Sequence, residues 1–300
     1  MASGAPAQDE QLSGRRPLFS VESTDGVSVA VHELSSSAAA AAPLLISHAT
    51  GFCGHAYAPL AAALGDRFRS MALDHRGHGA TMPPPGWEAG EGVDWRAFGD
   101  DTLAVARAID APGRLVGFGH SMGGSSLLMA AHRDPSQFAR LVLFEPIARP
   151  PEESPVDASA WPIVLGARRR KRQFPSFQVA FENFRSKPPL SAMTAEALRG
   201  YVEHGLRPTH DGGVELCCPP ELEAAIFVLG PRNRVWDLLP HIELPVLVVS
   251  GVIEPDQPSA SAAQIAERLP RGELVVLPDQ GHLGPFSHPR QVSEVVSAFV

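Results

Sequence analysis

Ser121 lies at the centre of the pentapeptide Gly-His-Ser-Met-Gly at residues 119–123. An apolar run, 115–118, precedes the pentapeptide, and a run of small and apolar residues, 125–131, follows it. This order predicts a strand, a tight turn and a helix, because glycines two residues either side of the serine leave room for neighbouring backbone. Such a turn exposes the hydroxyl at the amino end of a helix, where a developing anion is stabilised. We therefore predict that Ser121 is a nucleophile.

A serine hydroxyl needs a base that takes its proton and a third group that orients the base. His282 is the base that we predict, since it follows the last predicted strand, 273–277, in a glycine-bearing loop. That loop lies at the same end of the sheet as the turn around Ser121. His288 is the alternative, but Pro289 follows it and indicates the start of a helix. His120 is adjacent to Ser121 and is expected to point away from the hydroxyl.

Three carboxylates are candidates for the group that orients the base. Glu254 follows the predicted strand 246–251, and Asp256 lies two residues further on. Glu145 ends the apolar strand 141–144, directly after the helix that follows Ser121. A buried carboxylate needs a partner, so a structural hydrogen bond to loop amides is the other role open to Glu145. We rank Glu254 first, Glu145 second and Asp256 third.

Two backbone amides must converge on the oxyanion that forms when a carbonyl is attacked. Met122 supplies the first amide, at the predicted start of the helix. The second is expected from the loop 48–52, which follows the strand 44–47. Thr50 is our choice within that loop, and Ala49 is the alternative. Cys53 lies nearby, but nothing around it favours a thiolate, so we expect it to pack.

Short apolar runs alternate with amphipathic stretches along much of the chain, which predicts an α/β fold with a sheet covered on both faces. Asp25-Gly26 lies between two strand-like runs and indicates a hairpin. Strand signals disappear over residues 148–240, where helix-like segments and prolines dominate. We predict a disordered tail at 1–16, a core formed by 17–147 and 241–300, and a helical lid inserted at 148–240. A separate domain is the other interpretation of that segment.

Composition excludes several classes of protein. The 300 residues carry a formal net charge of −8, which argues against nucleic-acid binding. No run approaches the length of a membrane span, so we expect no integral membrane association. Three cysteines, two of them adjacent, fit a reducing cytoplasm better than a disulfide framework. No Cys/His cluster has zinc spacing, and we expect no bound metal.

Two features of the predicted lid bear on the substrate. Phe174, Phe177, Phe181 and Phe184 recur at helical spacing, which favours packing onto the body of the protein over lining an acyl pocket. An apolar acyl or alcohol group on a small-molecule substrate fits either role. The basic run at 168–172 could recognise an anionic substrate or acidic lipids. A solvated polar helix face is the interpretation that we favour for it.

These motifs, taken in chain order, resemble the α/β-hydrolase fold superfamily. The resemblance extends from about residue 19 to residue 300 and rests on S-H-A-T-G-F (47–52), L-D-H-R-G-H-G (73–79), G-H-S-M-G-G (119–124), S-G-V-I-E-P-D-Q-P (250–258) and P-D-Q-G-H (278–282). It implies a mostly parallel eight-stranded sheet, a Ser–acid–His triad and a cofactor-free mechanism through an acyl-enzyme. The chain departs from the family pattern at Ala49, where many members have glycine, and at Glu254, where aspartate is commoner. The segment 144–150 is similar to members that place a glutamate after the earlier strand.

The predicted function is that of a serine hydrolase acting on a carboxylic ester, a thioester or a lactone. The same triad could instead hydrolyse a carbon–carbon bond or catalyse perhydrolysis. A small-molecule receptor that retains the fold but turns over weakly is the alternative from a different class. The sequence leaves the particular substrate and the oligomeric state open.

Overall fold

The main sheet is the frame of the molecule. The computed structural model describes residues 16–35, 41–153, 157–255 and 257–300, so the predicted tail lies outside the described residues apart from Arg16. Over these ranges the main sheet has eight strands in the order β1-β2-β4-β3-β5-β6-β10-β11. The main-sheet strands are β1 (Phe19–Glu22), β2 (Ser28–Glu33), β3 (Ala42–Ser47), β4 (Phe68–Leu73), β5 (Leu115–His120), β6 (Phe138–Phe144), β10 (Val246–Ser250) and β11 (Gly272–Val276).

The strands of the main sheet are mostly parallel, as the family resemblance implies. β2 pairs antiparallel with β1 and with β4, whereas the pairs from β4 through β3, β5, β6 and β10 to β11 are all parallel. β5 and β10 are buried along their whole length, as expected for parallel strands covered on both faces. The predicted α/β fold with a mostly parallel eight-stranded sheet is confirmed.

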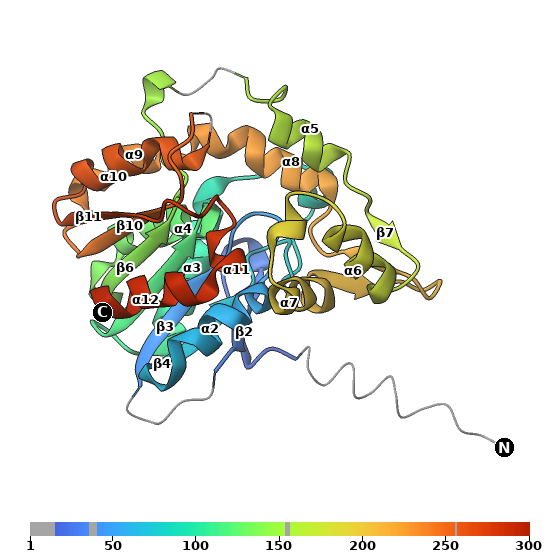
Figure 1. Ribbon diagram of the computed structural model, residues 1–300, viewed down its shortest axis with the longest axis horizontal. Coiled ribbons are helices and arrows are strands. Elements are labelled where there is room, and N and C mark those ends of the chain that lie inside the picture. The colour runs from blue at the N-terminus through green and yellow to red at the C-terminus, as the bar shows by residue number, and fades with distance from the viewer. Residues whose placement is uncertain (1–15, 36–40, 154–156, 256) are drawn as a thin grey trace.

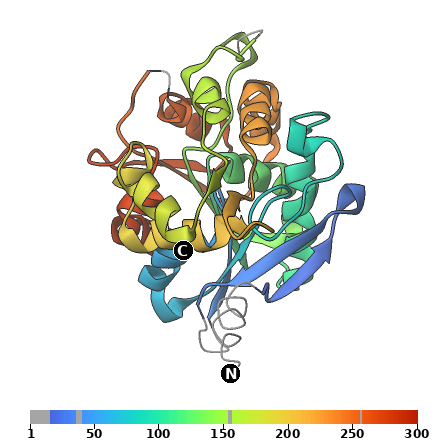
Figure 2. The same ribbon diagram turned by 90° about the vertical axis from the view of Figure 1, so that its right-hand side faces the viewer.

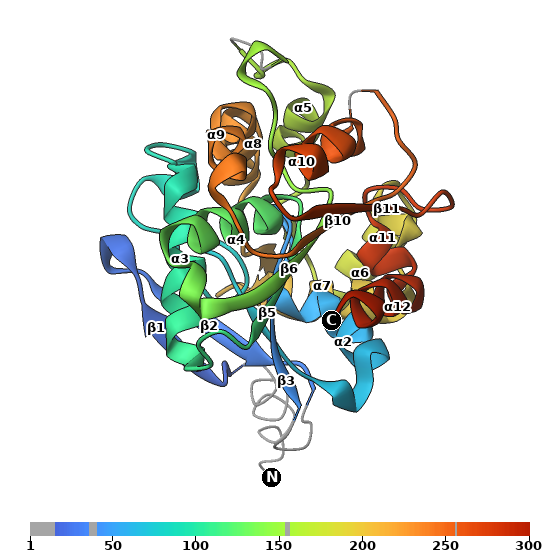
Figure 3. The same cartoon turned by 90° about the vertical axis from the view of Figure 1, so that its left-hand side faces the viewer.

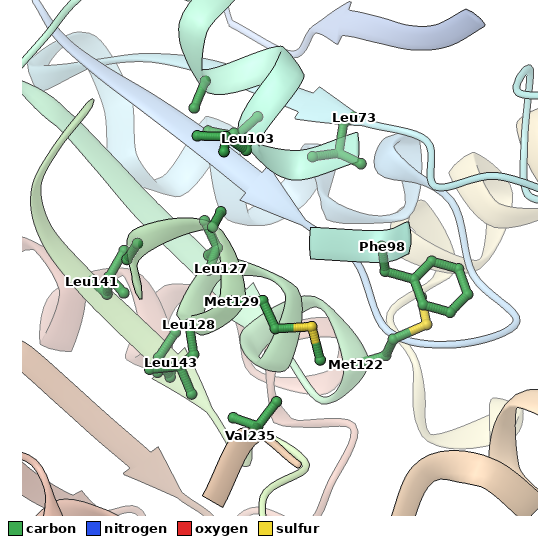
Figure 4. Packing of buried hydrophobic residues seen from close by; sticks show 14 of the residues in the cluster. Leu73, Phe98, Leu103, Met122, Leu127, Leu128, Met129, Leu141, Leu143 and Val235 are labelled. Atoms are coloured by element: carbon green, nitrogen blue, oxygen red, sulfur yellow. The ribbon is translucent and has the colours of Figure 1, made fainter. Parts of the chain in front are cut away.

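Helices cover both faces of the sheet (Figure 1, Figure 3). One face carries α3, α4, α9 and α10, whose apolar side chains form one buried cluster with the sheet (Figure 4). The other face carries α2, α7, α11 and α12, which form the second buried cluster. The helices are α2 (Ala58–Leu64), α3 (Trp95–Ile109), α4 (Met122–Arg133), α5 (Pro162–Arg168), α6 (Phe177–Arg185), α7 (Ala195–Gly205), α8 (Pro220–Leu229), α9 (Val235–Leu238), α10 (Ala262–Arg268), α11 (Gly284–Ser287) and α12 (Pro289–Phe299).

The segment between β6 and β10 contains helices α5 to α9, and also a small sheet that the sequence did not indicate. β7 (Gln173–Phe174), β9 (Val214–Leu216) and β8 (Leu206–Pro208) pair antiparallel in that order. Strands of two or three residues are too short to show the alternation that predicts a strand. The interpretation of residues 148–240 as a lid stays a prediction.

The four phenylalanines of this segment do not share one helix. Phe174 lies in β7, and Ser176 caps α6 by accepting a hydrogen bond from the Val179 amide at 3.2 Å. Proline and serine between Phe174 and Phe177 therefore end one element and begin the next. The rings of Phe174 and Phe184 are buried and meet edge to face at 5.2 Å. These contacts fit the packing role.

Along the described ranges, no helix combines the length and the apolar character that a bilayer crossing requires. The β1–β2 hairpin forms one edge of the main sheet and β11 the other, and the hairpin stands out at the margin of the molecule in Figure 2.

Three histidines from separate elements pack together beside β2. The rings of His55 and His204 stack at 3.4 Å, and the ring of His32 meets His55 edge to face at 4.4 Å. His32 also bonds Asp74 at 2.8 Å between Nε2 and Oδ2. Burial, together with the neighbouring imidazoles of His204 and His32, lowers the pKa of His55 from its ordinary 6.5 to about 3. His55 is therefore neutral in the folded protein at neutral and mildly acidic pH.

We predict that replacing His55 by phenylalanine weakens the acid sensitivity of folding. Below pH 6.5 the unfolded chain binds a proton at His55, whereas the folded chain does not until the pH approaches 3. The stability that this residue contributes is thus present above pH 6.5 and is lost as the pH falls from 6.5 towards 3. Between pH 7 and pH 4.5, the loss of unfolding free energy should be about 1–3 kcal/mol smaller in His55→Phe.

Reversible urea unfolding at the two pH values measures this difference. The same substitution at His210, which is exposed in a turn, is the control and should leave the loss unchanged. An equal loss in wild type and His55→Phe would show that His55 binds its proton equally well in both states.

Candidate active site

The turn at Ser121 joins β5 to α4 in a conformation that few residues adopt. Ser121 has φ 55° and ψ −118°, and a positive φ is strained for a residue with a side chain. Its amide donates to the carbonyl of Phe144 at 2.9 Å, and its carbonyl accepts from the amides of Gly124 and Ser125 at 3.0 and 3.3 Å. Backbone bonds on both sides hold the turn, as expected for a nucleophile elbow. Ser121 is buried but for 6% of its surface.

The glycines around Ser121 are required by close backbone approach. A Cβ on Gly123 would lie 2.0 Å from the carbonyl oxygen of Ser47 at the end of β3. A Cβ on Gly119 would lie 2.6 Å from the Cα of Gly124. The first turn of α4 therefore rests directly on the strand that leads into the loop 48–52. This contact explains the glycine spacing in physical terms.

A short hydrogen bond joins His282 to Glu145. Nδ1 of His282 donates to Oε2 of Glu145 at 2.6 Å, and Oε1 of Glu145 accepts from the Gly251 amide at 2.9 Å. Glu145 is 1% exposed, so both oxygens of this buried carboxylate are satisfied. A proton held on Nδ1 leaves the lone pair of Nε2 free to accept a proton.

The structure pairs His282 with Glu145 and not with Glu254, which the sequence ranks first. Glu254 is exposed, lies four residues beyond the end of β10, and has its amide bonded to Oγ of Ser259 at 3.1 Å. Glu145 follows β6 without a gap, at the strand that neighbours β5. Glu145 is held at the sheet edge because it comes directly after a buried strand, whereas the longer connection to Glu254 carries that residue away from the edge. Asp256 lies outside the described residues.

His288, the alternative base, bonds a neighbouring serine rather than Glu145. Its ring nitrogen Nδ1 bonds Oγ of Ser287 at 2.8 Å, and it is the exposed residue before α12. Cys53 is fully buried, and burial raises the pKa of its thiol well above the ordinary value. Both residues therefore behave as the sequence suggests, one at a helix start and one in packing.

His282 lies beside the residue that precedes Ser121. The rings of His120 and His282 are 4.8 Å apart, and Nε2 of His120 bonds the carbonyl of His282 at 2.8 Å. Within the described residues, no hydrogen bond joins the Ser121 hydroxyl to the His282 ring. Catalytic hydrogen bonds are often long until substrate is bound. Proton transfer between these two residues remains a prediction.

The amides of the loop 48–52 are used unequally. The Ala49 amide donates to the Tyr57 hydroxyl at 3.0 Å, and the Gly51 amide donates to Nε2 of His78 at 3.0 Å. The amides of Thr50 and Met122, by contrast, donate to no acceptor among the described residues. The side chains of Thr50 and Met122 are in contact, because Oγ1 of Thr50 donates to Sδ of Met122 at 3.4 Å. This favours Thr50 over Ala49 as the second oxyanion donor.

Sequence reasoning missed the side chains that hold this loop. Burial lowers the pKa of His78 to about 3, and its Nδ1 donates to the Arg76 carbonyl at 3.1 Å. The neutral ring can therefore accept from Gly51. The motif 73–79 pointed to His78, but Tyr57 carried no signal, because it begins an ordinary amphipathic stretch.

The basic run 168–172 is not a solvated helix face. α5 ends at Arg168, so the rest of the run lies beyond the helix. Arg170 is 19% exposed at its side chain and donates through Nη1 to Oε2 of Glu223 at 2.6 Å, and through Nη2 to the Tyr201 hydroxyl. Arg172 pairs with Glu215 at 3.3 Å.

In the part of the chain that the structure describes, no three His, Cys, Asp or Glu side chains are arranged to hold a metal ion.

The fold and the site together are those of an α/β hydrolase, with Ser121 and His282 at the carboxyl edge of a mostly parallel sheet. Residues 44–295 match the model of the alpha/beta hydrolase family. The chain therefore belongs to the alpha/beta hydrolase family, and it is an enzyme of that family.

Individual comparisons agree with this assignment. The chain is 26% identical over 255 residues to 2-(acetamidomethylene)succinate hydrolase from Mesorhizobium japonicum, covering 81% of this chain and 82% of the relative. The crystal structure of E-2-(acetamidomethylene)succinate hydrolase superposes with a TM-score of 0.72 at 22% identity, covering 94% and 98% of the two chains. A malate-bound esterase from Thermogutta terrifontis gives 0.67 at 24% identity, covering 94% and 97%. The two structures show the same fold.

We predict that Gly123→Ala disrupts the elbow. The added methyl group would collide with the Ser47 carbonyl, and rigid backbone on both sides leaves it no room. Thermal unfolding should show a loss of about 1–3 kcal/mol or more. Gly166→Ala is the control, because a Cβ there meets nothing within 4 Å on the exposed face of α5. The control should be neutral or slightly stabilising, and equal melting curves for both variants would refute the argument.

Proposed function

We propose that this enzyme is a serine hydrolase that cleaves a carboxylic ester, a thioester or a lactone through an acyl-enzyme on Ser121. The observation that carries the proposal is the 2.6 Å bond between His282 Nδ1 and Glu145 Oε2 beside a serine in a strained strand-to-helix turn. Glu145 is the acid of this proposal, in place of Glu254.

In the proposed mechanism, Oγ of Ser121 attacks the substrate carbonyl while Nε2 of His282 takes the hydroxyl proton. Glu145 keeps the other ring proton on Nδ1 and stabilises the imidazolium. The amides of Met122 and Thr50 bind the oxyanion, since neither donates to another acceptor among the described residues. The imidazolium then protonates the leaving group, and water activated by His282 releases the acid.

Comparison with relatives supports hydrolysis of a small molecule. The relative from Mesorhizobium japonicum is named a hydrolase of 2-(acetamidomethylene)succinate, and the Thermogutta terrifontis protein is an esterase. All three cysteines are buried, and two of them are adjacent in sequence, which supports a reducing compartment such as the cytoplasm over a disulfide framework.

Ser121→Ala should abolish turnover of p-nitrophenyl esters and covalent labelling by a fluorophosphonate probe, because both require the serine oxygen. Ser136→Ala, at an exposed serine, is the control for labelling and should react like wild type. Persistent labelling of Ser121→Ala would show that another residue is the nucleophile.

Glu145→Gln should lower kcat by about 10³- to 10⁴-fold. The glutamine oxygen can still accept from the Gly251 amide, so the fold is retained. Its amide group, however, donates towards Nδ1 and forces the ring proton onto Nε2, where it blocks the base. Glu254→Gln, at an exposed position, is the matched control and should remain active. Steady-state kinetics with circular dichroism as a check of folding measure both, and the reverse pattern would restore Glu254 as the acid.

A further inference from the structure

Three hydrogen bonds join the two loops of the site through buried side chains. The Ala49 amide donates to the Tyr57 hydroxyl at 3.0 Å, the Tyr57 hydroxyl bonds Nδ1 of His120 at 2.8 Å, and Nε2 of His120 bonds the carbonyl of His282 at 2.8 Å. Tyr57 and His120 are both 0% exposed. The series begins next to Thr50 and ends on the backbone of His282 itself.

The chemistry of the groups fixes the direction of every bond. A carbonyl can only accept, so Nε2 of His120 must carry the ring proton. In the neutral ring Nδ1 then accepts, which makes the Tyr57 hydroxyl its donor. The hydroxyl oxygen retains a lone pair for the Ala49 amide. All donors and acceptors of the series are therefore satisfied in one arrangement.

Burial and nearby charge keep the protonation states of His120 and Tyr57 unchanged, and with them the direction of each hydrogen bond. Burial lowers the pKa of His120 well below its ordinary value, and a positive charge on His282 lowers it further. Burial also raises the pKa of the Tyr57 hydroxyl well above its ordinary value. His120 thus stays neutral when His282 becomes an imidazolium, and Tyr57 stays a donor.

Packing restricts the same groups. The ring of Phe286, in α11, lies 4.7 Å from the Tyr57 ring and 5.4 Å from the His120 ring. Phe52, in the loop 48–52, lies 4.5 Å from Phe286. Aromatic rings therefore pack against the fully buried side chains of Tyr57 and His120.

We propose that His120 and Tyr57 are positioning residues that fix the base loop against the oxyanion loop. The role rests on the function proposed above. His120 sets the backbone of His282, and Tyr57 fixes the peptide between residues 48 and 49, which directly precedes the peptide that carries the Thr50 amide. One network then places the base and one oxyanion donor together, so a fault in it should affect both.

The first test compares Tyr57→Phe with Thr81→Val on p-nitrophenyl acetate. The Thr81 hydroxyl also accepts from a buried amide, that of Ala30 at 2.9 Å, and donates to the Asp74 carbonyl at 2.7 Å. Both variants lose a buried hydroxyl of the same bonding pattern. Tyr57→Phe should lower kcat by about 10- to 100-fold with KM little changed, and should shift the acid limb of the pH profile of kcat/KM, which reports the base. Thr81→Val should lose stability but keep kcat and the pH profile.

The second test compares two replacements of His120. The amide nitrogen of His120→Gln can still donate to the His282 carbonyl, whereas His120→Phe fills the space without a donor. We expect His120→Gln to retain a larger part of kcat, with both variants folded by circular dichroism.

The outcomes separate the two proposals. If wild type is active and labelled at Ser121, but Tyr57→Phe matches Thr81→Val in kcat and pH profile, the positioning role is wrong and the proposed function stands. Equal kcat for the two His120 variants would also overturn the role. A wild-type protein that neither turns over esters nor reacts with the fluorophosphonate would overturn the proposed function, and the positioning role with it.

Discussion

The parallel pairing of β5 with β6 is the constraint on which the rest of the site depends. In this register His120 lies opposite Phe144, so the residues that follow, Ser121 and Glu145, leave the sheet side by side. The Ser121 amide bonds the Phe144 carbonyl and the Glu145 amide bonds the Val249 carbonyl, which continues the ladder one step beyond each strand. A shift of one residue would turn the following side chains to the other face of the sheet. Ser121 and Glu145, the proposed nucleophile and acid, are thus placed by the same hydrogen bonds that build the sheet.

The loops above this edge are held by buried polar groups rather than by apolar packing alone. Asp74 accepts from the Gly54 and Ala80 amides, each at 2.8 Å, and from His32. Burial raises the pKa of this carboxyl, but His32 and the amides outweigh burial and lower it overall. Such groups are costly to bury unless every partner is present. The loops therefore have few alternative conformations, which is what a preorganised site requires.

Local sequence was sufficient where a single segment makes the structure. The strand, turn and helix around Ser121 could be predicted because glycine spacing and apolar runs lie within about fifteen residues. The sheet could be predicted for the same reason. The partner of His282 could not, because Glu145 and Glu254 both follow strands, and only the three-dimensional order places β6 between β5 and β10. The one local signal was distance from the strand end, which is one residue for Glu145 and four residues for Glu254.

Pairing between distant segments explains the other differences. β7 pairs with β9, about forty residues further along the chain. β8 and β9 pair across a short connection, and each of the three strands is too short to be seen alone. Arg170 looked like part of a charged surface, but Glu223 and Tyr201 lie across from it in the folded chain. Tyr57 and His120 are likewise 63 residues apart in sequence. Single-sequence patterns describe neighbours along the chain, and these contacts are neighbours only in space.

The proposed base comes from the edge of the sheet, whereas the proposed nucleophile comes from its centre. His282 follows β11, an edge strand on which Leu274 and Val276 are 38% and 41% exposed. Edge elements open at a lower free energy than the centre of a sheet. On warming, detachment of this border would remove the imidazole while the strands around Ser121 remain intact. The temperature at which activity is lost is then set by the opening of β11 and the loop that follows it, not by unfolding of the central strands.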